Sequence, residues 1–259
     1  MDTSRKITEL NKFIKDNHSW VEGYYSCYYE RYKVTSESKK EQDWKEQLRI
    51  LFVNVLNAGG EGKLSEKAET IRKFEGHVNR MQSPTYEELL KAFDVYDYQG
   101  LFEKLKDFKQ IGPKKSALFL RDILFFNKVI PDVQIIDNIP EGLEKELLVP
   151  VDVVITRTLN SIFDWNYTPS QFDEINSRAR EIFPEKPIWL EDLWFWGRFY
   201  RCIENKKNPK IPYCAFNKDL LIVDINVTRE YREKLMAFSE RQAECPFKKI
   251  CSKCEFSHI

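Results

Sequence analysis

Three cysteines stand close together near the end of the chain, at a spacing that suits metal ligation. Cys245, Cys251 and Cys254 form the pattern C-x5-C-x2-C in a chain of 259 residues. Because the start of the chain lacks the apolar core of a secretory signal, this clustering favours metal ligands over disulfides or scattered core thiols. His258 extends the pattern to C-x5-C-x2-C-x3-H, a set that suits tetrahedral zinc.

A short turn followed by two lysines is suited to binding a phosphate. The segment 101–126 reads LFEKLKDFKQIGPKKSALFLRDILFF, two amphipathic helical patterns joined by the residues KQIG at 109–112. Pro113 fits the first position of the second helix, whose first N–H groups and dipole favour an anion. Lys114 and Lys115 lie at the same end. The alternative is an ordinary packing element with a solvated lysine pair.

One carboxylate follows an apolar stretch and precedes a helical pattern. Asp152 comes after LVPV and before VVITRTL. A carboxylate at such a place caps the helix and interacts favourably with its dipole, and a capping role alone is common. Asp132 and Asp137, in the segment 127–147, are rival acidic residues.

Together these features resemble the helix-hairpin-helix (HhH-GPD) superfamily of DNA glycosylases. In that superfamily a Gly-hydrophobe-Gly turn opens a helix, and bifunctional members carry a lysine two residues after the second glycine, the position of Lys114. Gly112 supplies the second glycine, whereas Gln110 stands in place of the first, where a left-handed conformation would cost about 1 kcal/mol. The V-P-V-D segment resembles the one that ends in the superfamily's catalytic aspartate, which favours Asp152 over its rivals.

The resemblance implies an activity and a set of contacts. It implies a DNA glycosylase and AP lyase in which Lys114 attacks C1′ of a flipped-out nucleotide and Asp152 stabilises the positive charge that develops on the sugar. The turn would hold phosphates without reading sequence. The implied DNA contacts come from the turn, the lysine near it and the basic residues among the cysteines: Gln110, Ile111, Gly112, Pro113, Lys115, Lys248, Lys249 and Lys253.

The same resemblance implies a 4Fe-4S cluster at the end of the chain. The compact family spacing is C-x6-C-x2-C-x5-C, so the fourth ligand is displaced upstream here, to Cys202 or Cys214. The expected ligands are therefore Cys202, Cys245, Cys251 and Cys254, with zinc as the alternative metal.

The damaged base is less well defined by the sequence. The V-P-V-D segment most resembles the 8-oxoguanine branch, whereas the cysteines resemble the endonuclease III branch. An oxidised purine is the expected substrate, and an oxidised, mismatched or bulky modified pyrimidine is the alternative. A DNA-binding module with a structural metal and no chemistry is a further alternative. Five aromatic residues are candidates for the base pocket or for the core: Trp165, Trp189, Trp194, Phe195 and Trp196.

The charges are balanced overall but unevenly distributed. The chain has 41 basic and 41 acidic residues, which argues against DNA binding by bulk electrostatics alone. Residues 101–130 carry 7 basic and 3 acidic groups, residues 131–200 carry 6 and 13, and residues 201–259 carry 12 and 8. The turn and the cysteines thus lie in basic segments, although solvated helix faces would give the same counts.

The remaining patterns predict helices to position these residues. They predict a pair of helices over 4–33 that break near Asn17-His18, and helices over 40–57, 65–78 and 188–203. Helix starts are expected at a Thr85–Glu88 capping box and at Thr168-Pro169-Ser170, and the run 220–227 suits a strand or a short buried helix.

We therefore expect an all-α, or nearly all-α, helix-hairpin-helix glycosylase fold. It would form one unit over 1–259 that allows two lobes with the active site between them, with the hairpin at 101–126 and the metal loop at 202–259. No run reaches the ~18 apolar residues of a membrane helix. The expected protein is a cytoplasmic, nucleoid-associated monomer that acts on double-stranded DNA.

Overall fold

The chain is mostly helical in the part that the structure describes. The computed structural model describes residues 2–30, 43–58, 62–129, 135–200, 220, 227–241, 245–247 and 249–251. Within these ranges there are α-helices and short 3-10 helices, no strand, and one isolated bridge between Thr85 and Asp137. The predicted all-α class is confirmed. The predicted strand or helix at 220–227 lies mostly outside the described residues.

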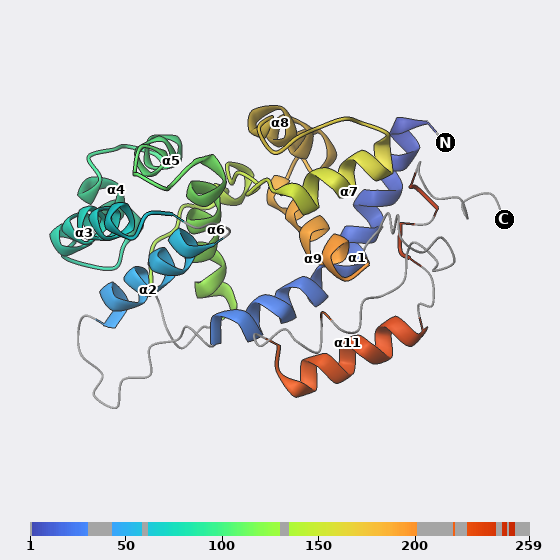
Figure 1. Ribbon diagram of the computed structural model, residues 1–259, viewed down its shortest axis with the longest axis horizontal. Helices are drawn as coiled ribbons and strands as arrows, with labels where there is room; N and C mark the ends of the chain where they lie inside the picture. Colours follow the sequence, from blue (N-terminus) through green and yellow to red (C-terminus); the bar gives the residue numbers. More distant parts are fainter. Residues whose placement is uncertain are drawn as a thin grey trace. The chain divides into compact units, whose positions relative to one another are not determined.

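The chain divides into two compact units, which we describe separately (Figure 1). The central unit comprises Tyr28–Pro150, and the terminal unit comprises Met1–Cys27 with Val151–Ile259. None of the described helices combines the length and the hydropathy needed to cross a lipid bilayer.

The central unit is built around stacked phenylalanines. Its helices are α2 (Asp43–Asn57), α3 (Leu64–Arg80), α4 (Tyr86–Ala92), α5 (Tyr98–Lys106), α6 (Pro113–Val129) and the 3-10 helix η1 (Leu143–Lys145). Phe52 of α2 stacks on Phe74 of α3 with ring centroids 3.8 Å apart, and Phe119 of α6 meets both rings edge-on at 5.4 and 5.3 Å. Because burying each ring contributes about 1.5–3 kcal/mol, this cluster fixes α2, α3 and α6 against one another.

The predicted start of α4 is capped by half of a capping box. The Thr85 hydroxyl accepts a hydrogen bond from the N–H of Glu88 at 3.2 Å, as the sequence predicts. The Glu88 carboxylate instead accepts from the N–H of Gln82 at 2.9 Å. The Glu88 side chain therefore bonds the loop that precedes the helix, and not the backbone N–H of Thr85 as in a complete capping box.

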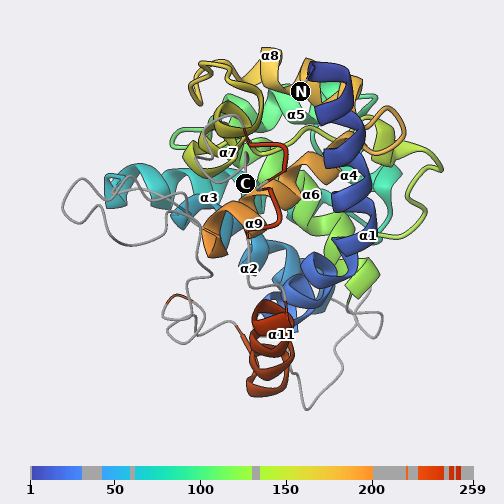
Figure 2. The same cartoon turned by 90° about the vertical axis from the view of Figure 1, so that its right-hand side faces the viewer.

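The terminal unit contains most of α1 (Thr3–Glu30) together with α7 (Val153–Phe163), α8 (Phe172–Ile182), the 3-10 helix η2 (Pro187–Glu191), α9 (Asp192–Phe199) and α11 (Arg229–Arg241). The helix α11 packs on α1, where the Tyr231 hydroxyl donates to the carbonyl of Trp20 at 2.5 Å and Gly23 leaves room for the Tyr231 ring (Figure 2). The largest buried rings of this unit, Phe195, Trp196 and Phe199, come from α9.

The predicted break in the first helical pattern is wrong, because α1 runs without interruption through Asn17 and His18. The Asn17 amide donates to the carbonyl of Phe13 at 2.8 Å, within the helix. The Nδ1 atom of His18 lies 2.8 Å from the Asp192 carboxylate, which compensates for the burial of the ring. Tertiary contacts therefore override the modest helix propensity of these residues.

Two other predicted helix boundaries also differ from the structure. The pattern over 188–203 divides into η2 and α9, which meet at Glu191 and Asp192, and residues after 200 lie outside the described part. The predicted cap at 168–170 is a turn: Thr168 and Ser170 bond each other at 2.7 Å, and α8 begins only at Phe172. In both cases local polar and proline signals lie near the boundary but do not fix its exact residue.

The close packing of α9 on α7 requires a glycine at position 197. A Cβ added to Gly197 would overlap the Thr158 hydroxyl and lie 3.1 Å from a Val154 methyl. We predict that Gly197→Ala lowers the free energy of unfolding by about 1–3 kcal/mol, measured by urea denaturation. Adding Thr158→Ala should recover part of the loss.

The matched control is Gly76→Ala in the interior of α3, where no atom lies within 4 Å of the added methyl. This change should raise stability by about 0.5–1 kcal/mol, because alanine is the better helix former. Equal effects of the two substitutions would contradict the packing argument.

Candidate functional site

The turn between α5 and α6 lies where the sequence predicts it. The helix α5 ends at Lys106, and Pro113 is the first residue of α6 (Figure 1). Within the turn, the N–H of Ile111 donates to the carbonyl of Phe108 at 3.0 Å, and both of these side chains are buried. The apolar residues of the turn therefore anchor it to the core, while Lys109 and Gln110 are exposed.

Gln110 adopts a left-handed conformation, with φ of 64°. For a residue with a side chain this conformation costs about 1–2 kcal/mol, so the surrounding structure must hold it. The helix α3 does so, because the Thr70 hydroxyl donates to the carbonyl of Lys109 at 2.8 Å and the Gln110 amide donates to the Glu66 carboxylate. The position at which the resemblance expects glycine thus has the backbone geometry of a glycine.

Gly112 has neither a left-handed backbone nor a crowded neighbourhood. Its φ is outside the positive range, and no atom lies within 4 Å of an added Cβ. Neither packing nor conformation requires a glycine here, and there is open space where a Cβ would lie. The first backbone hydrogen bond of α6 runs from the N–H of Ser116 to the carbonyl of Gly112 at 3.0 Å, so the N-terminal end of the helix dipole is at this open residue.

The two lysines after the turn have different surroundings. The Lys115 ammonium donates to the carbonyl of Leu56 at 2.7 Å, which places it at the C-terminal end of α2. Burial, followed by the charges of Lys67 and Lys114, lowers the pKa of Lys115. Lys115 thus ties α6 to α2, in the favourable position for a cation at a helix C-terminus. Lys114 lies half-buried in the first turn of α6.

Asp152 is the N-cap of α7, as predicted. Its Oδ1 atom accepts hydrogen bonds from the N–H groups of Val154 at 2.8 Å and Ile155 at 3.0 Å. At the opposite end of α7, the Lys6 ammonium donates to the carbonyl of Ile162 at 2.7 Å. Charged side chains thus hold both ends of the helix that carries this carboxylate.

The rival carboxylates do not share this geometry. Asp137 forms the bridge with Thr85 and accepts, through its carbonyl, from the N–H of Tyr86 at 2.9 Å, and it caps no described helix. Asp132 lies outside the described residues. Lys114 belongs to the central unit and Asp152 to the terminal unit, and each is placed within its own unit only.

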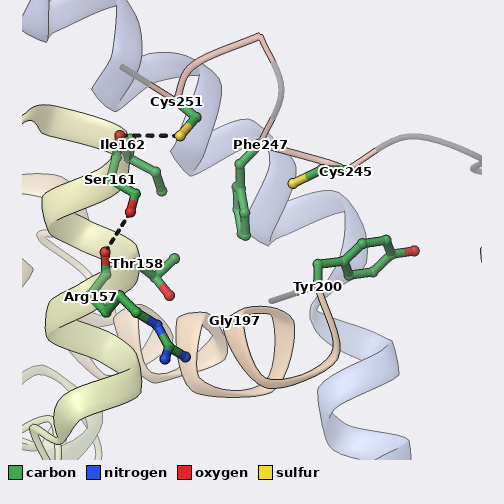
Figure 3. A pocket seen from close by; sticks show the side chains of 9 residues that line it. All are labelled: Arg157, Thr158, Ser161, Ile162, Gly197, Tyr200, Cys245, Phe247 and Cys251. Atoms are coloured by element: carbon green, nitrogen blue, oxygen red, sulfur yellow. Dashed lines mark hydrogen bonds between the residues drawn. The ribbon is translucent and has the colours of Figure 1, made fainter. Parts of the chain in front are cut away.

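Two of the four expected metal ligands lie in the described part of the chain. Cys245 and Cys251 are buried and line one small cavity with Arg157, Tyr200 and Phe247 (Figure 3). Cys251 donates to the carbonyl of Ser161 in α7 at 3.2 Å. Burial, followed by the charge of Cys245, raises the pKa of Tyr200 to about 12, so its hydroxyl is neutral at pH 7.

The other predicted residues of this region lie outside the described part: Cys202, Cys214, Cys254, His258, Lys248 and Lys253. Lys249 is described and exposed. No group of three or more metal-ligating side chains occurs among the described residues, which contain only two of the four expected cysteines.

Arg157 is the residue that the sequence analysis missed. It is half-buried on α7, and its Nη2 atom is buried without a hydrogen-bond acceptor among the described residues. The only available signal was a single charge in the otherwise uncharged helix VVITRTLNSIF. On sequence alone such a charge indicates a solvated helix face.

The five aromatic candidates for a base pocket all pack against other side chains. Phe195 and Trp196 are fully buried, Trp165 stacks on Phe163 at 4.3 Å, Trp189 lies against His18, and Trp194 lies against Tyr24. None of them lines the cavity with the cysteines.

No model of a protein family and no curated protein matches the sequence, and no solved structure matches the fold.

The left-handed turn residue gives a direct test of the turn geometry. We predict that Gln110→Gly raises the free energy of unfolding by about 0.5–1 kcal/mol, because glycine adopts φ of 64° without steric cost. Gln110→Ala is the control: it also removes the bond to Glu66 but keeps the strain, so it should not stabilise the protein. A glycine variant no more stable than the alanine variant in urea denaturation would contradict the assigned conformation.

Proposed function

We propose that this protein is a DNA glycosylase with AP-lyase activity, which flips a damaged base out of duplex DNA and excises it. The observation that carries the proposal is the turn before α6, where Gln110 takes the left-handed geometry expected of a glycine and Lys114 follows two residues after Gly112. An oxidised purine is the lead substrate, and an oxidised, mismatched or bulky modified pyrimidine is the alternative.

The turn supplies a contact for one DNA phosphate. The open backbone of Gly112 and the N-terminal end of the α6 dipole attract an anion, and contacts of this kind position a protein without reading the base sequence. Because the net charge is zero, binding would depend on such local contacts more than on the field of the whole molecule.

Lys114 is the proposed nucleophile. Its neutral amine attacks C1′ of the deoxyribose, the bond from C1′ to the base breaks, and the base leaves with the bonding electrons and takes up a proton. The attached amine loses a proton, the C1′–O4′ bond breaks, and O4′ takes up a proton, so that the opened sugar is held as an iminium. The iminium makes the C2′ proton acidic, and removal of that proton breaks the C3′–O bond and nicks the strand. The Lys115 ammonium instead ties α6 to the end of α2.

Asp152 is the proposed electrostatic partner of the reaction. A carboxylate stabilises the positive charge that develops on the sugar as the base departs, and it accepts a proton from the attacking lysine. Its two hydrogen bonds to backbone N–H groups fix the orientation of the carboxylate at the start of α7.

A metal centre at the end of the chain is part of the proposal. Cys202, Cys245, Cys251 and Cys254 would hold a 4Fe-4S cluster, or zinc with His258 as a ligand. Two of these four cysteines, Cys245 and Cys251, line one cavity of the terminal unit. When bound, the metal would supply a structural crosslink that fixes the basic segment around Lys249.

Borohydride trapping tests the chemistry. The wild-type protein should form a covalent adduct with duplex DNA that carries an oxidised purine or an abasic site, because borohydride reduces the iminium to a stable amine. Lys114→Ala should abolish the adduct, and Lys91→Ala, an exposed lysine of α4, is the control. If trapping persists in Lys114→Ala but is lost in Lys115→Met, the nucleophile is Lys115. If the wild-type protein shows no trapping on a panel of lesions, the protein is a DNA-binding module without this chemistry.

The substitution Asp152→Asn distinguishes the capping role of this residue from its proposed role in the reaction. Asparagine is an equally good N-cap, so stability and DNA affinity should change little while base release slows by about 100-fold or more. Base release at the wild-type rate would exclude Asp152 from the reaction.

Gly112→Ala tests the phosphate contact apart from the chemistry. The added methyl meets no atom of the protein, so stability should be unchanged. It would stand between the backbone and a phosphate, and the loss of one charge-assisted hydrogen bond should weaken DNA binding by about tenfold, measured by fluorescence anisotropy.

The salt dependence distinguishes this contact from that of a lysine. Gly112→Ala should leave the slope of log affinity against log salt unchanged, whereas Lys249→Ala, which removes an exposed cation from the expected DNA contacts, should reduce its magnitude by about one. Unchanged affinity in Gly112→Ala would contradict a phosphate contact at the turn.

A further inference from the structure

One side of α3 carries a row of basic side chains that begins next to the turn. The row consists of Lys73, His77 and Arg80, at the three- and four-residue spacing that keeps side chains on one side of a helix. Thr70, one helical turn earlier, donates through its hydroxyl to a carbonyl of the turn before α6 at 2.8 Å. Lys104 of α5 is close enough for its charge to act on His77. We call Lys73, His77, Arg80 and Lys104 the α3 patch.

Buried aromatic rings support the α3 patch from below. The Lys73 ammonium lies 4.3 Å from the centre of the Phe108 ring, just before the turn. The His77 ring stacks on Phe93 with centroids 4.3 Å apart and 9° between the planes. Both phenylalanines are buried, whereas Lys73 and Arg80 are exposed. The core therefore fixes the row in place and leaves its charges at the surface.

The nearby carboxylates do not neutralise the α3 patch. Asp94 lies 3.5 Å from Arg80, and Asp107 is exposed at the end of α5. Lys73 and Lys104 have no carboxylate partner within the described ranges. The patch thus keeps an excess of positive charge even with a neutral histidine.

His77 can add a further positive charge to the patch. Its Nδ1 atom lies 2.8 Å from the carbonyl of Ala92 and 2.6 Å from Arg80 Nη2, while its Nε2 atom has no hydrogen-bond partner in the described part of the chain. Burial lowers the pKa of His77, the contact with Ala92 opposes this effect, and the three other cations of the patch add to it. The ring is therefore neutral at pH 7, and an anion beside Nε2 would favour its protonation.

We propose that the α3 patch is a second contact with the DNA backbone, beside the phosphate contact at the turn. This inference rests on the proposed function, because it assumes that the partner is duplex DNA. From Thr70 to Arg80 the helix rises about 15 Å, and the phosphates of one DNA strand follow one another every ~3.4 Å along the duplex axis. The row is thus long enough to face about four phosphates, and contacts of this kind hold the duplex without reading its bases.

Fluorescence anisotropy with an undamaged duplex tests this contact apart from any chemistry. Lys73→Met and Lys104→Met keep an apolar stem and remove one charge each. Each should weaken binding by about three- to tenfold at about 0.1 M salt and reduce the slope of log affinity against log salt by about one. Lys234→Met is the matched control, because Lys234 is an exposed lysine of α11 in the other unit and pairs with Glu230 at 2.6 Å. It changes the net charge equally and should leave the slope unchanged.

The pH dependence of binding reports on His77. A phosphate beside the imidazole raises its pKa, so binding takes up a proton and strengthens as the pH falls. Between about pH 8 and pH 6 the affinity of the wild type should rise about three- to tenfold more than that of His77→Asn, which keeps a hydrogen-bond donor near the position of Nδ1 but does not titrate. The chain has three histidines, and this comparison separates His77 from the other two. If the melting temperature shows that His77→Asn is not folded, the two lysine variants decide the question.

The outcomes separate this inference from the proposed function. Wild-type slopes in both lysine variants, together with weakened binding in Gly112→Ala, would overturn the contact at the α3 patch and leave the proposed function in place. A wild-type protein that does not bind duplex DNA would overturn both. Reduced slopes in a protein that gives no borohydride trapping would support the α3 patch as a DNA contact and remove the proposed chemistry.

Discussion

The arrangement around α6 depends on the hydrogen bonds that connect α3 to the turn before α6. The hydrogen bond from Thr70 to the carbonyl of Lys109, and the bond from Gln110 to Glu66, keep a residue with a side chain in a left-handed conformation. The phenylalanine cluster beneath them fixes α3 against α2 and α6. The position of the open Gly112 backbone and of Lys114 therefore follows from the packing of the central unit.

Charged side chains at the helix ends also hold the helices of each unit in place. Lys115 binds the last turn of α2, Lys6 binds the last turn of α7, and Asp152 accepts the first N–H groups of α7. Each contact places a charge where the helix dipole favours it, so these residues orient their helices as well as stabilise them. A lysine of α6 thus ties the helix that carries Lys114 to α2, and a lysine of α1 binds the helix that Asp152 caps.

Local signals in the sequence predicted the features that are local in origin. Pro113 and Gly112 predicted the turn, and Asp152 before a helical pattern predicted its cap, because proline, glycine and capping side chains act over one or two residues. The continuity of α1 through His18 was not predictable, since it depends on Asp192, far away in the sequence. The conformation of Gln110 depends likewise on α3, and the surroundings of Arg157 depend on residues near position 250.

The left-handed residue also bears on the motion of the turn. A glycine at position 110 would let the peptide planes on either side rotate between several orientations, whereas the glutamine side chain, tethered to α3, confines them to one. The N–H groups that follow are therefore oriented before any phosphate arrives. The entropy of ordering them is lost during folding, so the proposed phosphate contact needs no rearrangement of the turn's backbone.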